Sequence, residues 1–329
     1  MPSNTAPGKL ATSDIFPIQL RFFLKVHEDG RCERFVGTTI LPSGVDPLTG
    51  VHSKDIVISP ETNLNARIYI PKNATTGRRL PILIYYHGGG FVVDSPRSTT
   101  YQPTLNLLTA DAESDVVIVA IDYRLAPEYP IPIGYNDSWE GTKWVATHSK
   151  GSGPEAWLND YGDFEKVFFI GDSAGANIAH NMAIRAGLEP IKEINLEGII
   201  LLNPYFGGND PIGLECGKNK ELKGYTDEFW LFANPSKSGL DDPLFNPGKN
   251  PNLSALGCSR IFVSVAEYDS FRDRGFLYKE LMEKSGWNGK LEFLESKNEN
   301  HVFFLFDTSC DNACNLRDTV RSFINRSQN

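Results

Sequence analysis

A single serine, Ser173, stands between small residues in the run Gly171-Asp172-Ser173-Ala174-Gly175. Bulky apolar residues at 167–170 precede this run, and a stretch of helical character follows at 176–186. This order fits a nucleophile elbow, a strained turn between a strand and a helix that exposes the serine hydroxyl. A serine at this place could also be a simple N-cap of the helix. The other residues of the chain have to distinguish the two interpretations.

Three consecutive glycines, Gly88 to Gly90, follow His87 at the end of an apolar run at 82–86. Glycine loses more conformational freedom on folding than any other residue, so three in a row need a reason. A flexible turn is one reason. The other is that their backbone N–H groups can approach an anionic oxygen closely, as in the loop that accompanies a serine elbow. We expect an oxyanion hole formed by the N–H groups of Gly88, Gly89 and Ala174.

A serine hydroxyl is a weak nucleophile unless a base lies beside it, and histidine is the usual base. The chain has six histidines: His27, His52, His87, His148, His180 and His301. In proteins with this elbow the base follows the serine in the sequence, after an acid. His180 lies about two turns beyond Ser173 on the same predicted helix and would point elsewhere. The remaining candidate is His301, in a polar loop near the end of the chain.

The acid that orients the histidine should lie between Ser173 and His301 in the sequence. Asp269 comes just after an apolar run at 260–265, where a short carboxylate at a strand end can reach the imidazole. Glu267 is the alternative, since it lies closer to the strand. Asp273 is expected to begin the next helix. We predict a triad of Ser173, Asp269 and His301.

The candidate site residues follow apolar runs in which polar and apolar positions do not alternate. Such runs are typical of strands covered on both faces of a parallel sheet. Strands are expected at 81–86, 116–121, 167–170, 198–202, 260–265 and 291–294. Helices are expected at 102–110, 135–147, 176–186, 271–284 and 315–324. Strands and helices therefore alternate from residue 80 to the end, which predicts an α/β fold with a mostly parallel sheet.

The N-terminal part and one insertion depart from this rhythm. Residues 1–17 are expected to form an arm, 22–36 a hairpin around an Asp-Gly turn, and 55–59 and 66–70 two alternating strands. The insertion at 203–252 is rich in Gly, Pro and Asn, and we interpret it as a lid packed beside the N-terminal region. Its aromatic residues, with Phe91, could line a substrate pocket or form the lid's own core; the candidate pocket residues are Phe91, Tyr225, Phe229 and Trp230.

The composition excludes several classes of partner and site. The net charge is −9 over 329 residues, which argues against a nucleic-acid or anionic-membrane partner. Residues 18–24 are too few and too charged for a signal peptide or a membrane span. Five scattered cysteines indicate neither a disulfide framework nor a metal site, although Cys310 and Cys314 are four residues apart. We expect a cytoplasmic protein without metal or organic cofactor; the sequence does not predict its oligomeric state.

Taken together, the motifs resemble those of the plant carboxylesterases, in the hormone-sensitive-lipase-like branch of the α/β-hydrolases. The resemblance extends from about residue 20 to the end and rests on five motifs in the correct order: His87 to Phe91, Asp122 to Glu128, Gly171 to Asn177, Asp269 to Gly275 and His301 to Phe303. It implies one α/β-hydrolase domain over 1–329, with a cap formed by residues 1–50 and 203–252. It also implies hydrolysis of a small-molecule carboxylic ester by the predicted triad and oxyanion hole.

The same family contains proteins with other functions. Gibberellin receptors resemble these esterases but lack the catalytic histidine and bind hormone without turnover, so His301 argues against a receptor. Some plant relatives are dehydratases or cyclases of isoflavonoid or alkaloid pathways, and one such branch has threonine at the nucleophile position. Ser173 favours hydrolysis but leaves elimination or cyclisation open as an alternative.

Overall fold

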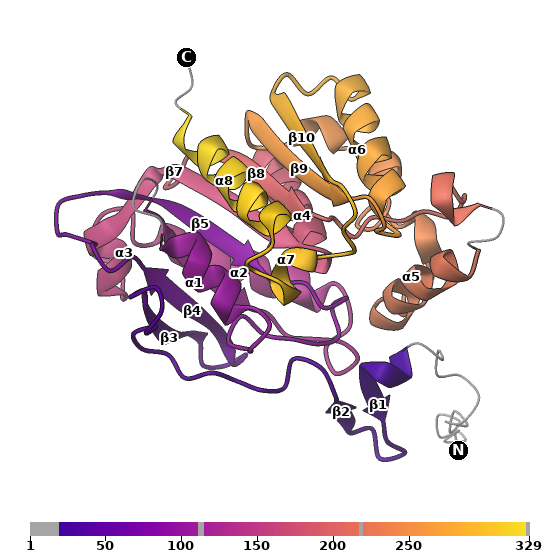
Figure 1. The fold of residues 1–329 in the computed structure, drawn as a ribbon, viewed down its shortest axis with the longest axis horizontal. Helices are drawn as coiled ribbons and strands as arrows, with labels where there is room; N and C mark the ends of the chain where they lie inside the picture. The colour runs from indigo at the N-terminus through magenta and orange to yellow at the C-terminus, as the bar shows by residue number, and fades with distance from the viewer. Residues whose placement is uncertain (1–19, 111–114, 217–219, 327–329) are drawn as a thin grey trace, which may run out of the picture.

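The computed structural model describes residues 20–110, 115–216 and 220–326. Its centre is an eight-stranded sheet with the strand order β10-β9-β8-β7-β5-β6-β4-β3, and a two-stranded hairpin, β1–β2, lies apart from it (Figure 1). The strands are β1 (Leu24–Val26), β2 (Cys32–Arg34), β3 (His52–Ser59), β4 (Leu64–Ile70), β5 (Leu80–Tyr86), β6 (Val117–Asp122), β7 (Gly162–Asp172), β8 (Leu196–Leu202), β9 (Arg260–Ala266) and β10 (Lys290–Ser296).

The six strands from β10 to β6 pair in parallel, whereas β4 is antiparallel to both β6 and β3. The predicted α/β fold, with an antiparallel beginning and a mostly parallel sheet, is therefore confirmed. Parallel strands direct all their carboxyl ends to one edge of the sheet. The segments that follow β5, β7, β8, β9 and β10 carry the predicted site residues, so the topology gathers them at that edge.

Helices cover both faces of the sheet (Figure 1). They are α1 (Gln102–Thr109), α2 (Ile133–Ala146), α3 (Ala156–Tyr161), α4 (Ala174–Leu188), α5 (Lys220–Ala233), α6 (Arg272–Lys284), α7 (Phe303–Phe306) and α8 (Asp311–Asn325). Successive residues of β5 enter different cores: Ile82 and Ile84 belong to the cluster that includes α2 and α4, and Leu83 to the cluster that includes α1 and α8. Burial of both faces explains why these strands contain no polar alternation.

Three helices differ from the sequence-based prediction. The short helices α3 and α7 were not predicted, because helices of six and four residues are too short to show a periodic pattern. The insertion, which we interpreted as a lid without assigning a helix to it, contains a 14-residue helix, α5. Gly224 and Thr226 lie within this helix, and both residue types have low helix propensity. The tertiary contacts of the insertion outweigh that local preference.

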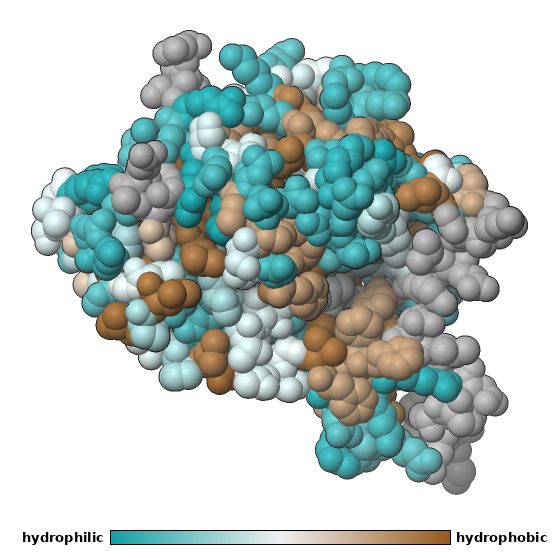
Figure 2. All heavy atoms as spheres, viewed as in Figure 1, coloured by the Kyte–Doolittle hydropathy of each residue, from teal (hydrophilic) through white to brown (hydrophobic). Residues whose placement is uncertain are grey.

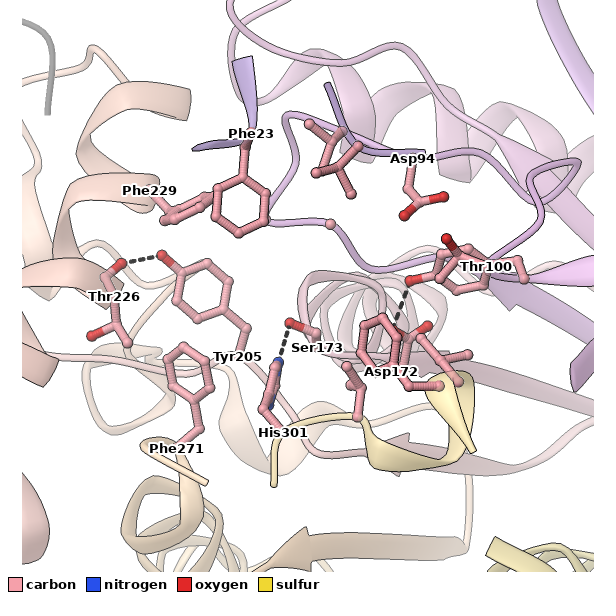
Figure 3. Close-up of a pocket in the computed structure, with 18 residues that line it drawn as sticks. Phe23, Asp94, Thr100, Asp172, Ser173, Tyr205, Thr226, Phe229, Phe271 and His301 are labelled. Carbon is pink, nitrogen blue, oxygen red and sulfur yellow. Dashed lines mark hydrogen bonds between the residues drawn. The ribbon is translucent and has the colours of Figure 1, made fainter. Parts of the chain in front are cut away.

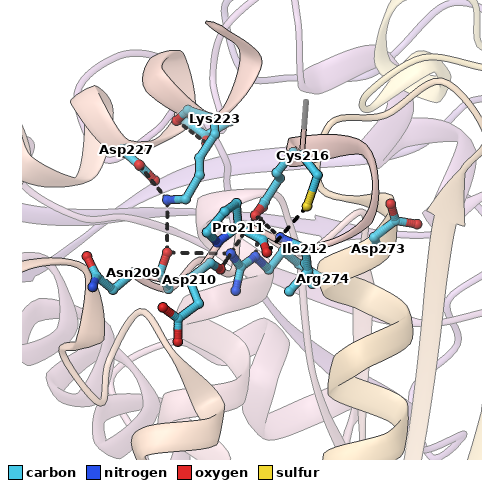
Figure 4. A network of polar contacts seen from close by, with 12 residues as sticks. Asn209, Asp210, Pro211, Ile212, Cys216, Lys223, Asp227, Asp273 and Arg274 are labelled. Atoms are coloured by element: carbon cyan, nitrogen blue, oxygen red, sulfur yellow. Dashed lines mark hydrogen bonds and ion pairs between the residues drawn. The ribbon is translucent and has the colours of Figure 1, made fainter. Parts of the chain in front are cut away.

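Polar contacts of Arg274 attach the insertion to α6 (Figure 4). Arg274 of α6 lies 2.5 Å from Glu215, and both side chains are almost completely buried. Arg274 also donates to the backbone oxygen of Asp210 at 2.7 Å. Lys223 of α5 pairs with Asp227 at 2.6 Å and donates to the backbone oxygen of Gly208. The contacts of Lys223 lie within the insertion, whereas those of Arg274 join the insertion to α6. Because removing one member of a buried pair leaves an uncompensated charge, the Arg274–Glu215 pair holds the insertion on the body of the protein.

The N-terminal hairpin and the insertion meet through aromatic rings. Phe23, next to β1, makes an edge-to-face contact with Phe229 of α5, with ring centroids 5.0 Å apart. Arg34 of β2 holds the hairpin on the body by bonding to Glu128 and to the backbone oxygen of Val92. Apolar residues gather on the surface around the hairpin (Figure 2), and Val36 and Phe306 are among the exposed ones in the chain.

All five cysteines are free thiols, so Cys310 and Cys314 do not form a bridge. Among the residues that the structure describes, no group of His, Cys, Asp or Glu side chains is arranged to hold a metal ion. The helices within those same residues are all too short or too polar to cross a membrane.

Candidate active site

Ser173 connects the end of β7 to the start of α4 in a strained backbone conformation, with φ 51° and ψ −118°. Few residues other than glycine adopt this region, and such outliers gather at functional sites. Its side chain makes no capping hydrogen bond to the helix. The Oγ atom instead lies 2.9 Å from Nε2 of His301. The arrangement is therefore that of an elbow and not of an N-cap.

The two glycines of the elbow motif are required by close backbone contacts. A Cβ atom on Gly175 would lie 1.9 Å from the backbone oxygen of Tyr86, and one on Gly171 would lie 2.4 Å from the backbone of Gly175. Both distances are far below van der Waals contact, and backbone atoms at the centre of a sheet cannot move away cheaply. The small residues thus allow α4 to begin directly against β5 and β7, which raises Ser173 above the sheet.

We predict that Gly175→Ala destabilises the protein by about 3 kcal/mol, because the added methyl group overpacks the contact with Tyr86. Urea unfolding followed by circular dichroism measures this change. The matched control is Gly224→Ala in α5, where a Cβ atom meets nothing within 4 Å. That substitution should be neutral or slightly stabilising, since alanine favours a helix. Equal stability of the two variants would contradict the packing argument.

His301 joins Ser173 to Asp269. Its Nε2 lies 2.9 Å from Ser173 Oγ, and its Nδ1 lies 2.8 Å from Asp269 Oδ2 (Figure 3 shows the first contact). Because an ionised carboxylate only accepts hydrogen bonds, Nδ1 carries the proton and Nε2 is left to accept the hydroxyl proton of Ser173. The structure thus brings together the three residues predicted from the sequence, which lie on loops after β7, β9 and β10.

Asp269 is fixed by two further hydrogen bonds. Its Oδ1 accepts from the backbone N–H of Phe271 at 2.9 Å, and its Oδ2 accepts from the side-chain amide of Asn203 at 3.1 Å. The side chain is only 1% exposed. Glu267, the alternative acid, accepts from the backbone N–H of Asn298 and does not contact the histidine. The role of Asn203 was not predicted, since only the fold places the end of β8 beside Asp269.

The surroundings of His301 change its pKa. Burial alone would lower the pKa of His301, but the negative charge and hydrogen bond of Asp269 outweigh burial and raise it above the usual 6.5. The buried carboxyl group of Asp172 acts in the same direction. The imidazole therefore binds a proton more readily than a free histidine does.

We predict that kcat/KM for a non-ionising ester falls as the pH is lowered through a midpoint above 6.5. Only the neutral imidazole can accept the proton of Ser173, and the raised pKa moves its protonation to higher pH. Initial rates measured across buffers of constant ionic strength give the midpoint. The charge of Asp269 accounts for the upward shift, so Asp269→Asn should lower the pKa of His301 itself. A profile that stays flat through pH 6.5 would contradict the assignment of the base.

Two other histidines near the sheet have structural contacts. His180 is buried in α4, where its Nδ1 lies 3.1 Å from the hydroxyl of Tyr278, as expected for a side chain that points away from the elbow. His87 is buried and stacks on Tyr123, with ring centroids 4.3 Å apart. Burial lowers the pKa of His87 to about 4, so it stays neutral and supports the glycine loop that follows it.

Gly88 does not face the site as predicted. Its N–H points inward and donates to the hydroxyl of Tyr101 at 2.7 Å and to Asp172 Oδ1 at 3.2 Å. Tyr85 and Tyr101 also donate to the buried carboxylate of Asp172, each at 2.8 Å. An amide committed to these groups cannot bind an oxyanion, so the expectation for Gly88 is wrong. Its contacts instead attach the glycine loop to the elbow.

The next two glycines line the cavity beside Ser173. Gly89 and Gly90 both have positive φ, 89° and 61°. A Cβ atom would strike Val93 at Gly89 and the ring of Phe229 at Gly90. Within the described residues, no acceptor is found for the N–H groups of Gly89, Gly90 or Ala174. The backbone N–H groups of these three residues are therefore available to donate to an oxyanion. Gly90 replaces Gly88 in the predicted set.

A cavity of about 300 Å³ opens above Ser173 and His301 (Figure 3). Most of its lining is apolar, and the aromatic residues in it are Phe23, Tyr101, Tyr205, Phe229, Phe271 and Phe306. Phe229 was among the predicted pocket residues. The side chain of Tyr225, another of them, lies outside the part of the chain that the structure describes.

The other two predicted pocket residues, Phe91 and Trp230, belong to the core beneath the lid. Phe91 is 3% exposed and Trp230 is fully buried, and neither lines the cavity. Trp230 stacks on Phe245 with ring centroids 4.6 Å apart and donates to the backbone oxygen of Gly239. The expectation that they contact substrate is therefore wrong, because these large rings are used to pack α5 against the body.

Comparison with known proteins agrees with this geometry. A family model described as the α/β-hydrolase fold matches residues 83–305. Probable carboxylesterase 2 of Arabidopsis thaliana is 42% identical over 311 residues, which cover 94% of this chain and 96% of that protein. The 2-hydroxyisoflavanone dehydratase of Glycyrrhiza echinata is 40% identical over 322 residues, 95% of this chain and 97% of that protein.

Solved structures show the same relationship. An esterase of Pyrobaculum calidifontis superposes with a TM-score of 0.67 at 26% identity, covering 83% of this chain and 84% of that one. The elbow, the glycine loop and the order of the site residues are thus accompanied by similarity over nearly the whole chain. This protein belongs to the α/β-hydrolase family and, within it, to the plant carboxylesterases.

Proposed function

We propose that this protein is a serine carboxylesterase that hydrolyses esters of small molecules through an acyl-enzyme. The observation that carries the proposal is the continuous hydrogen-bonded chain from Ser173 Oγ through His301 to the buried Asp269. The esterase names of its relatives support the same conclusion. Neither the triad nor its reaction requires a metal ion or an organic cofactor.

In the first half of the reaction, His301 Nε2 accepts the proton of Ser173 as Oγ attacks the ester carbonyl carbon. The carbonyl oxygen becomes an oxyanion, for which the N–H groups of Gly89, Gly90 and Ala174 are the proposed donors. Each such donor contributes roughly 3–4 kcal/mol to stabilisation of the transition state in other enzymes. The carbon–oxygen bond to the alcohol then breaks, and His301 returns its proton to the departing alcohol.

In the second half, water takes the place of the alcohol. His301 accepts a proton from the water as its oxygen attacks the acyl carbon, and the bond to Ser173 Oγ breaks with return of that proton to the serine. The acid is released and the free enzyme is restored. Throughout, Asp269 stabilises the imidazolium and keeps the proton on Nδ1.

The cavity supports an apolar substrate of moderate size, in agreement with its volume of about 300 Å³ and its aromatic lining. We propose that the β1–β2 hairpin and α5 form a cap over this cavity, which the contact between Phe23 and Phe229 supports. A cytoplasmic location belongs to the same proposal, since five free thiols suit a reducing compartment.

An eliminating enzyme is the second candidate, because one relative is named a dehydratase. Ser173 favours hydrolysis, since a hydroxyl hydrogen-bonded to a histidine is arranged for nucleophilic attack rather than for proton abstraction from carbon. A receptor without turnover is disfavoured because the histidine and acid beside the serine are both in place.

Labelling with a fluorophosphonate probe tests the proposal, because only an activated serine displaces fluoride and becomes phosphonylated. We expect stoichiometric labelling of the peptide that contains Ser173, together with loss of turnover of a p-nitrophenyl ester. A protein that hydrolyses the ester but stays unlabelled at Ser173 would refute the acyl-enzyme. A protein that is labelled but releases no acid from any ester would favour elimination.

A further inference from the structure

One side of the cavity carries a carboxylate that the proposed reaction does not use. Among the residues whose side chains the structure describes, the acidic ones that line the cavity are Asp94 and Asp172. Asp172 is committed to hydrogen bonds from Tyr85, Tyr101 and Gly88 beneath the elbow. Figure 3 shows Asp94 beside Thr100, on the side of the cavity opposite Phe229, with Ser173 between the two sides.

Hydrogen bonds within the described residues hold one of the two carboxylate oxygens of Asp94. Its Oδ1 accepts from the hydroxyl of Ser98 at 2.5 Å and from the backbone N–H of Ser95 at 3.2 Å. Among the described residues, no hydrogen bond ends on Oδ2. The carboxylate is therefore oriented by its neighbours and keeps one oxygen available to a ligand.

No basic residue of the described chain neutralises this charge. Arg97, three residues further on, pairs with Asp122 at 2.7 Å. His301, the one histidine that lines the cavity, bonds to Asp269 and Ser173. A partly buried carboxylate without a cation attracts any cation that reaches it, because solvent screens a partly buried pair less than a fully exposed one.

The backbone conformation alone does not require a carboxylate here. Asp94 has a φ of 79°, a region that asparagine tolerates as well as aspartate does. An asparagine oxygen could also accept from Ser98 and from the N–H of Ser95. What aspartate adds over asparagine is its negative charge. A charge at a strained backbone position in the cavity points to a function in ligand recognition.

We propose that Asp94 determines specificity by binding a protonated amine on the ester substrate, while the aromatic walls enclose the apolar remainder. The carboxylate supplies a charge-assisted hydrogen bond to the ammonium N–H. The inference rests on the proposed function, because it assigns a substrate class to the same site: esters that carry a basic amine in the acyl or the alcohol part.

The test compares esters that differ only in this charge. One pair is S-dimethylaminoethyl thiobutyrate and its carbon isostere, S-isopentyl thiobutyrate. A second pair places a dimethylamino or an isopropyl group at the end of a five-carbon acyl chain in an S-ethyl thioester. Dissociation constants are measured at pH 7 by calorimetry in a Ser173→Ala background, where the thioesters should stay intact. The background is combined with Asp94→Asn or with the control Asp318→Asn, which removes an exposed carboxylate of α8.

In at least one pair, we expect the amine to bind about 10- to 100-fold more tightly than its isostere, the range for a hydrogen bond to a charged group. Asp94→Asn should abolish this preference, and Asp318→Asn should retain it. No preference in either pair, or a preference that survives Asp94→Asn, would overturn the inference.

The proposed function is tested separately by turnover of the neutral isosteres by the wild-type protein. Hydrolysis of the isosteres without an amine preference would refute the role of Asp94 and leave the esterase intact. An amine preference in binding without hydrolysis of any thioester or p-nitrophenyl ester would refute the esterase and leave a cation-binding pocket at Asp94.

Discussion

Replacing Ser173 by alanine should lower kcat/KM for a p-nitrophenyl ester by at least about 10⁴-fold, because the acyl-enzyme can no longer form. The residual rate would come from the oxyanion donors and from substrate binding. Initial rates at saturating and subsaturating ester give kcat and KM, and titration with a fluorophosphonate gives the active-site concentration of the wild-type protein.

The matched control for this substitution is Ser322→Ala in α8. Ser322 is exposed, and among the described residues its hydroxyl accepts one weak hydrogen bond, from Arg326 at 3.4 Å. The activity of this variant should equal that of the wild type. Ser173→Ala should keep the circular dichroism spectrum of the wild type, since no structural hydrogen bond depends on the Ser173 hydroxyl among the described residues. A folded Ser173→Ala protein with wild-type turnover would exclude Ser173 as the nucleophile.

Asp269→Asn should lower kcat by about 10⁴-fold with little change in KM. An asparagine amide can donate to Nδ1 of His301, which would leave the proton on Nε2 and remove the base that faces Ser173. The loss should therefore come from the wrong tautomer and not from unfolding. Stopped-flow measurement of the first turnover shows whether acylation is the step that slows.

Glu267→Gln is the control for the acid, because Glu267 lies two residues away and bonds to the backbone N–H of Asn298 instead of to the histidine. We expect its kcat to stay within a few-fold of the wild type, as for other surface substitutions that touch no reacting group. A large loss in Glu267→Gln together with a small loss in Asp269→Asn would reverse the assignment of the acid.

The positions of Ser173, Asp269 and His301 could be predicted because each follows a strand of a parallel sheet, namely β7, β9 and the edge strand β10. The strands themselves are recognisable from apolar runs such as 82–86, and their carboxyl ends must meet at one edge. Only the order of the motifs and the topology were needed. The side-chain distances then follow from the elbow, whose glycines set how closely α4 approaches β5.

The oxyanion donors could not be predicted as reliably, because they depend on contacts between distant residues. Gly88 is withdrawn from the site by Tyr101 and by Asp172, which lies 84 residues further along the chain. Adjacent glycines look alike in the sequence, and Gly88 differs from Gly90 because its N–H donates to the Tyr101 hydroxyl and the Asp172 carboxylate. The sequence does not show the buried network of Tyr85, Tyr101 and Asp172, and this network determines which glycine N–H groups remain free.

The lining of the pocket was the least predictable part. Aromatic residues such as Trp230 and Phe229 are neighbours on one helix, yet the first packs into the core and the second faces the cavity. An aromatic residue type indicates that the side chain will be buried, but not whether it packs in the core or lines the cavity. Asp94 belongs to no sequence motif. Its proposed role in substrate binding depends on its positive φ and on the absence of a neutralising cation among the described residues, and neither can be read from the sequence.

The most direct test of the account is intact-protein mass spectrometry of the enzyme mixed rapidly with p-nitrophenyl acetate and quenched in acid. We predict one added acetyl group in the wild-type protein, located by peptide mapping on Ser173, and none in the Ser173→Ala variant. Turnover of the ester with no acetyl group on Ser173 at any time point, or with the acetyl group on another residue, would contradict the proposed mechanism.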